Sequence, residues 1–116
     1  MKCTVRNVIA ITQGSREDIL IRMTDPDTGE RLDLSQFESG EVKFCTSAGT
    51  VITKAIDPWP VADPKLGVIE FQLSSDDTAQ FDEQMTDFEA EFVYTGTTDK
   101  KVLIFENALE VTERVC

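Results

Sequence analysis

The sequence contains no histidine, the side chain that most often serves as a general base or metal ligand near neutral pH. A catalytic pair of carboxylates would need one desolvated member with a raised pKa. The adjacent acids here, Asp76 with Asp77 and Asp82 with Glu83, lie in polar stretches instead. We therefore expect a protein that is not an enzyme and that uses no cofactor.

Cysteine is also scarce, since Cys3, Cys45 and Cys116 are far apart and form no CxxC pattern. An odd, widely spaced set is typical neither of a zinc site nor of a disulfide framework. We expect reduced thiols, with a Cys3–Cys116 bridge between neighbouring terminal strands as the alternative. Cys45 has the parity of Glu41 and Lys43, and without a histidine to generate a thiolate we expect no nucleophile there.

No apolar run approaches the roughly 18 to 20 residues that a membrane-spanning helix needs. The first residues show neither an uninterrupted apolar segment nor a cleavage-site pattern, so no signal peptide is predicted. We expect a protein that stays in the compartment where it is made and has no membrane partner.

Positive charge is limited, because 11 Lys and Arg residues against 22 Asp and Glu residues give a formal net charge of −11. Residues 66–99 contain no Lys or Arg. Nucleic-acid binding needs a basic surface that displaces counterions from phosphate, so we exclude nucleic acid as a partner. We interpret the acidic stretch as a solvated face that aids solubility, with a docking face for a basic partner as the alternative.

The sequence does contain a strong hairpin signal in residues 87–112. One face of its first arm carries Phe88, Ala90, Phe92 and Tyr94, and the opposite, solvated face carries Glu89, Glu91, Val93 and Thr95. A turn-rich segment at 96–100 is followed by a second, apolar arm. This pattern is typical of an antiparallel hairpin with one solvated face and one buried face.

Similar signals occur along the rest of the chain. Further strands are predicted at residues 4–12, 16–24, 41–46, 50–56, 68–73 and 109–112. Their alternation predicts that Ile19, Ile21 and Met23 point inward in the second of these, and Val42 and Phe44 in the third. Short helical turns are expected near Leu34 and after Ser75, which suits an N-cap position. Together these signals predict an all-β antiparallel sandwich of about seven or eight strands with one or two short helical turns. Residues 1–116 are expected to form a single domain.

The segment Asp-Pro-Asp-Thr-Gly-Glu at residues 25–30 predicts a tight surface turn, because proline presets φ and glycine supplies a positive φ. Its acids also suggest a calcium loop. Gly29 stands fifth rather than sixth, however, and Gln36 occupies the twelfth position, where an EF-hand has glutamate. We predict no metal site and keep a weak calcium site of Asp25, Asp27 and Glu30 as the alternative.

The order of these signals also matches a known pattern. A break at Gly14 and Ser15 precedes an apolar strand, Asp-Thr-Gly-Glu-Arg-Leu-Asp-Leu occupies residues 27–34, and a Val42–Phe44 strand follows. Later come Gly-Val-Ile-Glu-Phe-Gln-Leu at 67–73, Ser-Asp-Asp-Thr at 75–78 and Phe-Glu-Ala-Glu-Phe at 88–92. Over residues 8–111 this order resembles the small immunoglobulin-like domains of tailed-phage virion proteins, in particular the N-terminal domain of baseplate upper proteins. The chain departs from that family in the proline-rich segment around Trp59. As a single expected domain, it would also depart from it by having no second domain.

The resemblance implies an immunoglobulin-like β-sandwich that serves as a non-enzymatic virion structural protein. It would be a tail, baseplate or neck adaptor, or a capsid decoration or cement protein, assembled in the host cytoplasm. Its partners would be other virion proteins, in a symmetric assembly that can include copies of itself, held by loops and edge strands. The candidate loop residues are Asp25, Asp27, Glu30, Trp59, Val61, Thr97 and Lys100.

An alternative function is a soluble ligand-binding module, for example a carbohydrate-binding β-sandwich. Such a site would use exposed aromatic rings, for which the sequence offers Trp59 and Tyr94.

Overall fold

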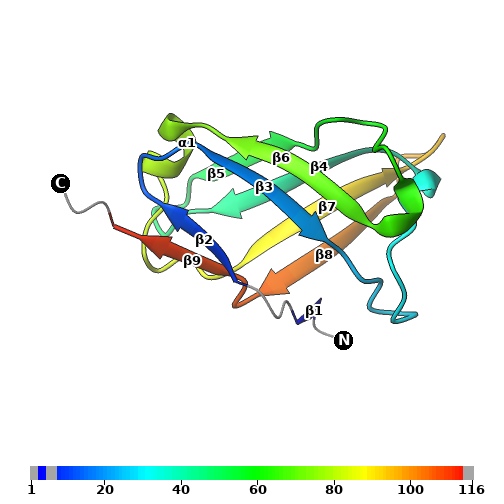
Figure 1. Cartoon of the computed structure of the whole chain (residues 1–116), viewed down its shortest axis with the longest axis horizontal. Coiled ribbons are helices and arrows are strands. Elements are labelled where there is room, and N and C mark those ends of the chain that lie inside the picture. Colours follow the sequence, from blue (N-terminus) through cyan, green and yellow to red (C-terminus); the bar gives the residue numbers. More distant parts are fainter. Residues whose placement is uncertain (1–2, 5–7, 114–116) are drawn as a thin grey trace.

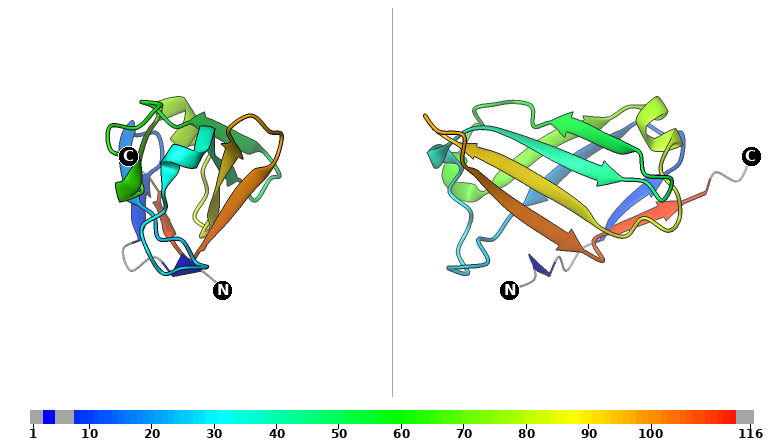
Figure 2. Two further views of the ribbon diagram at one scale, coloured as in Figure 1. Left: turned by 90° about the vertical axis from the view of Figure 1, so that its right-hand side faces the viewer. Right: turned by 180° about the vertical axis from the view of Figure 1, so that it is seen from behind.

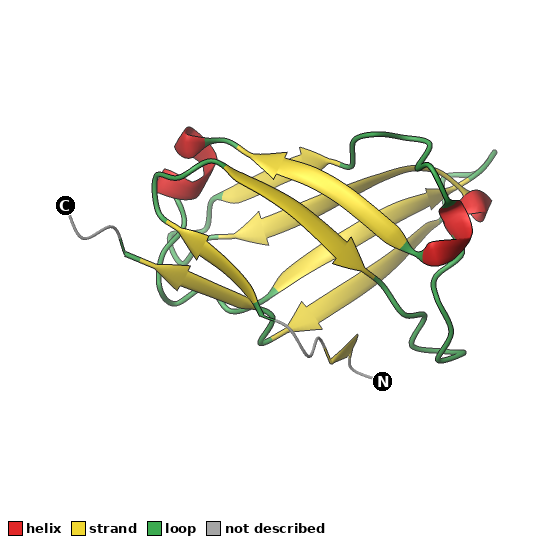
Figure 3. Ribbon diagram, in the orientation of Figure 1, coloured by secondary structure: helices red, strands yellow, loops and turns green. Residues whose placement is uncertain are grey.

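The computed structural model describes residues 3–4 and 8–113, which form two packed β layers (Figures 1 and 3). The elements are the strands β1 (Cys3–Thr4), β2 (Ile9–Thr12), β3 (Glu17–Arg22), β4 (Phe37–Cys45), β5 (Val51–Ala55), β6 (Val68–Leu73), β7 (Phe88–Tyr94), β8 (Lys100–Glu106) and β9 (Leu109–Thr112), the α-helix α1 (Ser75–Ala79), and the 3-10 helices η1 (Leu34–Gln36) and η2 (Pro64–Leu66). The predicted all-β sandwich with short helical turns is confirmed.

The strands divide between the two layers of a β-sandwich. One layer is the five-stranded sheet β1-β8-β7-β4-β5, and the other contains the pairs β3–β6 and β2–β9. Figure 1 shows the second layer in front of the first, and Figure 2 shows both layers end-on. The pairs formed by β1 with β8 and by β2 with β9 are parallel, whereas the others are antiparallel.

A cluster of phenylalanine rings joins the two layers. Phe44 on β4 lies with its ring centroid 6.0 Å from that of Phe71, which comes from β6 in the facing layer. Its ring is also 5.0 Å from Phe81, which follows α1, and 5.5 Å from Phe88 on β7. All four side chains are buried, so the inward parity predicted for Phe44 and Phe88 is confirmed. Aromatic contacts of this kind contribute stability beyond their buried area.

The predicted hairpin of residues 87–112 is formed by β7 and β8. Their antiparallel register runs from Phe88 opposite Phe105 to Val93 opposite Lys100. Phe88 and Phe92 are buried, while Tyr94 is half-buried with its ring 4.8 Å from that of Phe37.

Strand β4 begins at Phe37, four positions before the predicted start at Glu41. A register shift between Phe37 and Ser39 interrupts its pairing with β7 and lets the extra residues join the sheet. Gly40 lies in this segment, and a Cβ atom placed there would come within 2.6 Å of the Phe92 ring and 2.8 Å of Ile56. The glycine is therefore needed for close packing of β4 against the core.

The α1 helix begins one residue earlier than the sequence pattern indicated, since its N-cap is Ser74 and not Ser75. The Ser74 hydroxyl accepts a hydrogen bond from the Asp77 N–H at 3.1 Å, and an Asp77 carboxylate oxygen accepts one from the Ser74 N–H at 2.8 Å. This reciprocal capping box requires an acid three residues after the cap, and Asp77 provides it for Ser74.

Several predictions concern the ends of the chain. The single first strand expected at residues 4–12 is described as β1 and β2, with residues 5–7 outside the described part. The side chains of Cys3 and Cys116 also lie outside it, whereas Cys45 is free and exposed. None of the described helices has the length and apolar character needed to cross a membrane.

Candidate interaction surface

The three candidate loops lie at the same end of the sandwich, on the right in Figure 1 and on the left in the right-hand view of Figure 2. They are the turn at residues 25–30 after β3, the proline-rich connection at 57–63 between β5 and β6, and the tip at 95–99 between β7 and β8. We call this the loop end. Antibody variable domains also carry their binding loops together at one end of a sandwich.

The 25–30 turn is closed by its own backbone. The Asp25 N–H donates to the Glu30 carbonyl at 2.7 Å, and the Gly29 N–H donates to the Asp25 carbonyl at 2.8 Å. Gly29 has a φ of 74°, which fits the glycine that the turn was predicted to require. Asp27 and Glu30 are exposed at its surface, so the turn presents carboxylates to solvent.

Lys101 connects this turn to the five-stranded sheet. Its Nζ lies 3.8 Å from Asp25 Oδ1 and 3.4 Å from Asp27 Oδ2. Its side chain is 18% exposed, so the ammonium group is largely held against the turn. The two aspartates weighed as calcium ligands thus already have a fixed cation beside them. Within residues 3–4 and 8–113, no group of three or more Cys, Asp or Glu side chains is arranged to hold a metal ion.

The proline-rich connection is attached to the core by two of its apolar side chains. Trp59 and Val61 are partly buried and pack against the core cluster, and the Trp59 ring centroid is 6.3 Å from that of Phe92. The Asp57 N–H donates to the Glu70 carbonyl at 3.0 Å, which fixes the start of the connection to β6. The connection is therefore anchored by the side chains that sequence reasoning selected as contacts.

The 95–99 tip is fixed at its base. The Thr95 N–H donates to the Gln36 carbonyl at 3.1 Å, and the Thr97 N–H donates to the Tyr94 carbonyl at 3.1 Å. Thr97 itself is exposed, and so is Lys100 just beyond the tip. The structure therefore presents these two candidate side chains at the loop end on a constrained backbone.

Lys100 also takes part in an ion-pair cluster on the outer face of the five-stranded sheet. Glu91 on β7 lies 2.5 Å from Lys100 Nζ and 2.9 Å from Lys43 Nζ. Hydrogen bonds from Lys100 and then Lys43 lower the pKa of Glu91 below its usual value, against the opposing effect of desolvation. Glu91 has the predicted outward parity, yet the residue is only 8% exposed.

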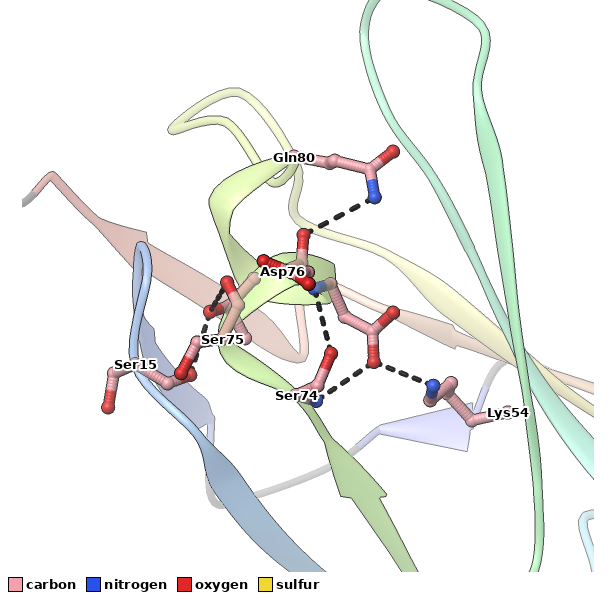
Figure 4. A network of polar contacts seen from close by, with 8 residues as sticks. Ser15, Lys54, Ser74, Ser75, Asp76 and Gln80 are labelled. Atoms are coloured by element: carbon pink, nitrogen blue, oxygen red, sulfur yellow. Dashed lines mark hydrogen bonds and ion pairs between the residues drawn. The ribbon is translucent and has the colours of Figure 1, made fainter.

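An inward-facing lysine is found on β5, an edge strand of the same sheet. Lys54 on the edge strand β5 shares the parity of buried Ile52 and Ile56, and its Nζ lies 2.6 Å from Asp77 Oδ2 (Figure 4). Desolvation would raise the pKa of Asp77, but hydrogen bonds from Lys54 and from the Ser74 N–H outweigh it and lower that pKa.

Inward-pointing charges on edge strands oppose edge-to-edge pairing with another sheet. The described pairing of β1 with β8 is limited to Phe105 and Glu106, so Lys101 lies on the part of β8 beyond this pairing. Lys101 has the parity of buried Leu103 and Phe105, just as Lys54 has that of its buried neighbours on β5. Both lysines break the apolar alternation of their strands, which is a signal that could have been read from the sequence. Their positions favour contacts through loops over addition of a strand.

The outer surface also carries apolar side chains that sequence reasoning did not select. Leu20, Leu66, Val102 and Ile104 are each about half exposed, at 57%, 52%, 48% and 55%. Leu66 lies at the loop end in η2, where it lines a groove described below.

Comparison with protein-family models and with curated proteins gave no match for this chain.

Proposed function

We propose that the chain is a non-enzymatic structural protein of a phage virion, acting as an adaptor of the tail, baseplate or neck or as a decoration or cement protein. It binds other virion proteins through its loop end. The observation that carries the proposal is the gathering of the three loops at one end, each anchored to the sandwich by hydrogen bonds, ion pairs or core contacts.

Anchored loops suit a protein that has to bind in many identical copies. A constrained loop loses less conformational entropy on binding than a flexible one, so more of the contact energy remains as affinity. The resemblance of residues 8–111 to small immunoglobulin-like domains of tailed-phage proteins supports the virion setting.

The inward-facing Lys54 and Lys101 refine the mode of contact. Pairing of a partner strand on the β5 edge would bring it close to Lys54, which already pairs with Asp77 of α1. We therefore assign the contact to loops, and the edge strands to limiting unwanted association.

A carbohydrate-binding module receives less support from the same residues. Trp59 and Tyr94 are both half-buried, with their rings against Phe92 and Phe37. Sugar-binding platforms need an aromatic face that is open to the ligand, and these two faces are partly used by the core.

The proposal is tested by co-sedimentation with phage particles from the source that encodes the chain. Wild-type protein is expected to migrate with particles on a density gradient and to give immunogold labelling at one defined position. Recovery only with soluble protein at the top of the gradient would contradict the proposal.

Two matched variants then locate the contact. Thr98→Arg changes an exposed residue in the 95–99 tip, while Ala48→Arg changes an exposed residue in the β4–β5 turn at the opposite end. We expect Thr98→Arg to lose incorporation and Ala48→Arg to keep it. The reverse result would assign the contact to the other end of the sandwich.

A further inference from the structure

A groove with a volume of about 230 Å³ lies beside the proline-rich connection, between that connection, η2 and β6. Its apolar lining includes Pro58, Val61, Leu66 and Val68, and its acidic lining is Asp63 and Glu70. The side chain of Leu66 is an exposed part of this lining, as Leu66 is 52% exposed. An apolar cavity of about 150 Å³ is enough to bind benzene, so this groove has room for one large apolar side chain.

The apolar surface continues from the groove onto β3. Leu20 is 57% exposed and lies directly opposite Glu70 in the β3–β6 register. Arg22 lies opposite Val68, which lines the groove. A partner segment with one side chain in the groove would therefore also contact the apolar surface on β3 beside it.

The charges around the groove favour a basic partner. Asp63 and Glu70 line it, and Asp57 lies beside it through the backbone hydrogen bond from its N–H to the Glu70 carbonyl. No lysine or arginine is among the lining residues, although Arg22 is one strand away.

Lys65 belongs to η2, beside the groove, but is not among the residues that line it.

We propose that the groove binds a segment of a partner protein that inserts one aliphatic or aromatic side chain next to lysine or arginine. The inserted side chain contacts Leu66, Val61 and Val68, and the flanking cation pairs with Asp63 and Glu70. This inference deepens the proposed function by giving the partner's chemistry at the loop end, and it rests on that function only for the identity of the partner as a protein.

A second copy of the chain is a poorer occupant. Each copy has a formal net charge of −11, so two copies repel one another. The most suitable segment of the chain itself is the start of β8, but Lys100 is paired with Glu91 and Lys101 with the 25–30 turn.

Two-dimensional amide NMR of the purified protein tests the proposal with a peptide as probe. The probe is the acetylated, amidated peptide Gly-Ser-Arg-Leu-Arg-Ser-Gly. In one matched control peptide both arginines are glutamate, and in another the leucine is serine. We expect saturable shifts of the amides of Leu66, Val68 and Glu70, with a dissociation constant on the order of 1 mM. Both control peptides should bind more weakly than the arginine peptide, and added salt should weaken the binding of the arginine peptide.

Protein variants separate the apolar and acidic contributions. We expect Leu66→Ser to weaken binding about tenfold and Glu70→Gln to weaken it about two- to fivefold. Val51→Ser, an equally exposed apolar position on β5, and Glu110→Gln, an exposed acid on β9, serve as controls that should leave binding unchanged. Dispersed amide spectra confirm that each variant is folded.

Three results would overturn the proposal. One is that the arginine peptide shifts amides over the whole acidic surface and binds Leu66→Ser as tightly as wild type. Another is that the glutamate peptide binds as tightly as the arginine peptide. The third is a dimer in sedimentation velocity that is lost in Leu66→Ser, which would assign the groove to a second copy. Because the peptide assay needs no particles, its failure would leave the co-sedimentation result standing, and the two outcomes remain distinguishable.

Discussion

The ion pair between Lys54 on the edge strand β5 and Asp77 in α1 gives a quantitative prediction about the stability of the sandwich. Asp77 makes two interactions at once, since it accepts the Ser74 N–H in the capping box and pairs with Lys54 at 2.6 Å. The two side chains are 29% and 16% exposed, which makes this a partly buried ion pair. Asp77→Ala removes both interactions, Asp77→Asn removes the charge and keeps an acceptor oxygen, and Lys54→Met removes the cation while keeping an apolar stem.

The expected losses follow from these contacts. Loss of a capping interaction costs about 1 kcal/mol, and loss of a moderately exposed ion pair costs about 0.5 to 1 kcal/mol. Asp77→Ala should therefore lower the free energy of unfolding by about 1.5 to 2 kcal/mol. For a chain of 116 residues, each 1 kcal/mol corresponds to about 4 °C in Tm.

The assay is urea unfolding followed by Trp59 fluorescence and far-ultraviolet circular dichroism. A double-mutant cycle between Lys54→Met and Asp77→Asn should give a coupling energy of about 0.5 to 1 kcal/mol. The control is the same kind of cycle between Arg16 and Asp18, a 3.6 Å ion pair whose side chains are 63% and 70% exposed. A Lys54–Asp77 coupling no larger than that of the exposed control would refute the reasoning.

Three further predictions concern acid stability, packing and association. The folded-state pKa of Glu91 is lowered by its ion pairs with Lys100 and Lys43. Its carboxylate therefore stabilises the folded protein above the unfolded pKa of about 4.3, and this contribution is lost as pH falls through the folded pKa. The difference in free energy of unfolding between wild type and Glu91→Gln should thus narrow in urea titrations from pH 6 to pH 2.5, and a constant difference would contradict this prediction. Gly40→Ala should cost about 1 to 3 kcal/mol, measured as Tm, because the added Cβ comes within 2.6 Å of the Phe92 ring. Lys101→Val should increase self-association in sedimentation velocity relative to wild type and to the control Lys65→Val, and unchanged association would show that this lysine does not protect the edge.

Much of the fold could be predicted from the sequence because alternation reports which face of a strand is buried. Phe88 and Phe92 on β7, and Ile19 and Ile21 on β3, are buried as their parity predicted. The cap of α1 was misplaced by one residue because Ser74 and Ser75 are both good caps. The choice depends on which serine has a partner three residues later, and Asp77 selects Ser74.

The candidate surface was less predictable because it depends on strand order. Three loops far apart in the sequence share one end only because β3, β5 and β7 all finish there, which alternation does not report. The groove at Leu66 depends likewise on how the proline-rich connection folds back on β6. Lys54 and Lys101 were visible as polar residues at inward positions, but their acidic partners come from α1 and from the turn after β3, which strand alternation does not place.

Burial of Glu91 has a similar explanation. Period-two alternation assigned it to the outer face, and it lies there between β4 and β8. Its low exposure comes from Lys43 and Lys100 on those neighbouring strands, which close over its carboxylate. The low exposure of Glu91 therefore follows from the pairing of β7 with its neighbours, which alternation within one strand does not report.

The proposal that the loop end binds other proteins of a virion is tested by cross-linking mass spectrometry of purified particles. Lys65 in η2 is exposed and provides a reactive amine at the loop end. We expect peptides of this chain in the particles, with cross-links from Lys65 to other virion proteins. Particles without this chain, or cross-links to other proteins that never include Lys65, would rule the proposal out.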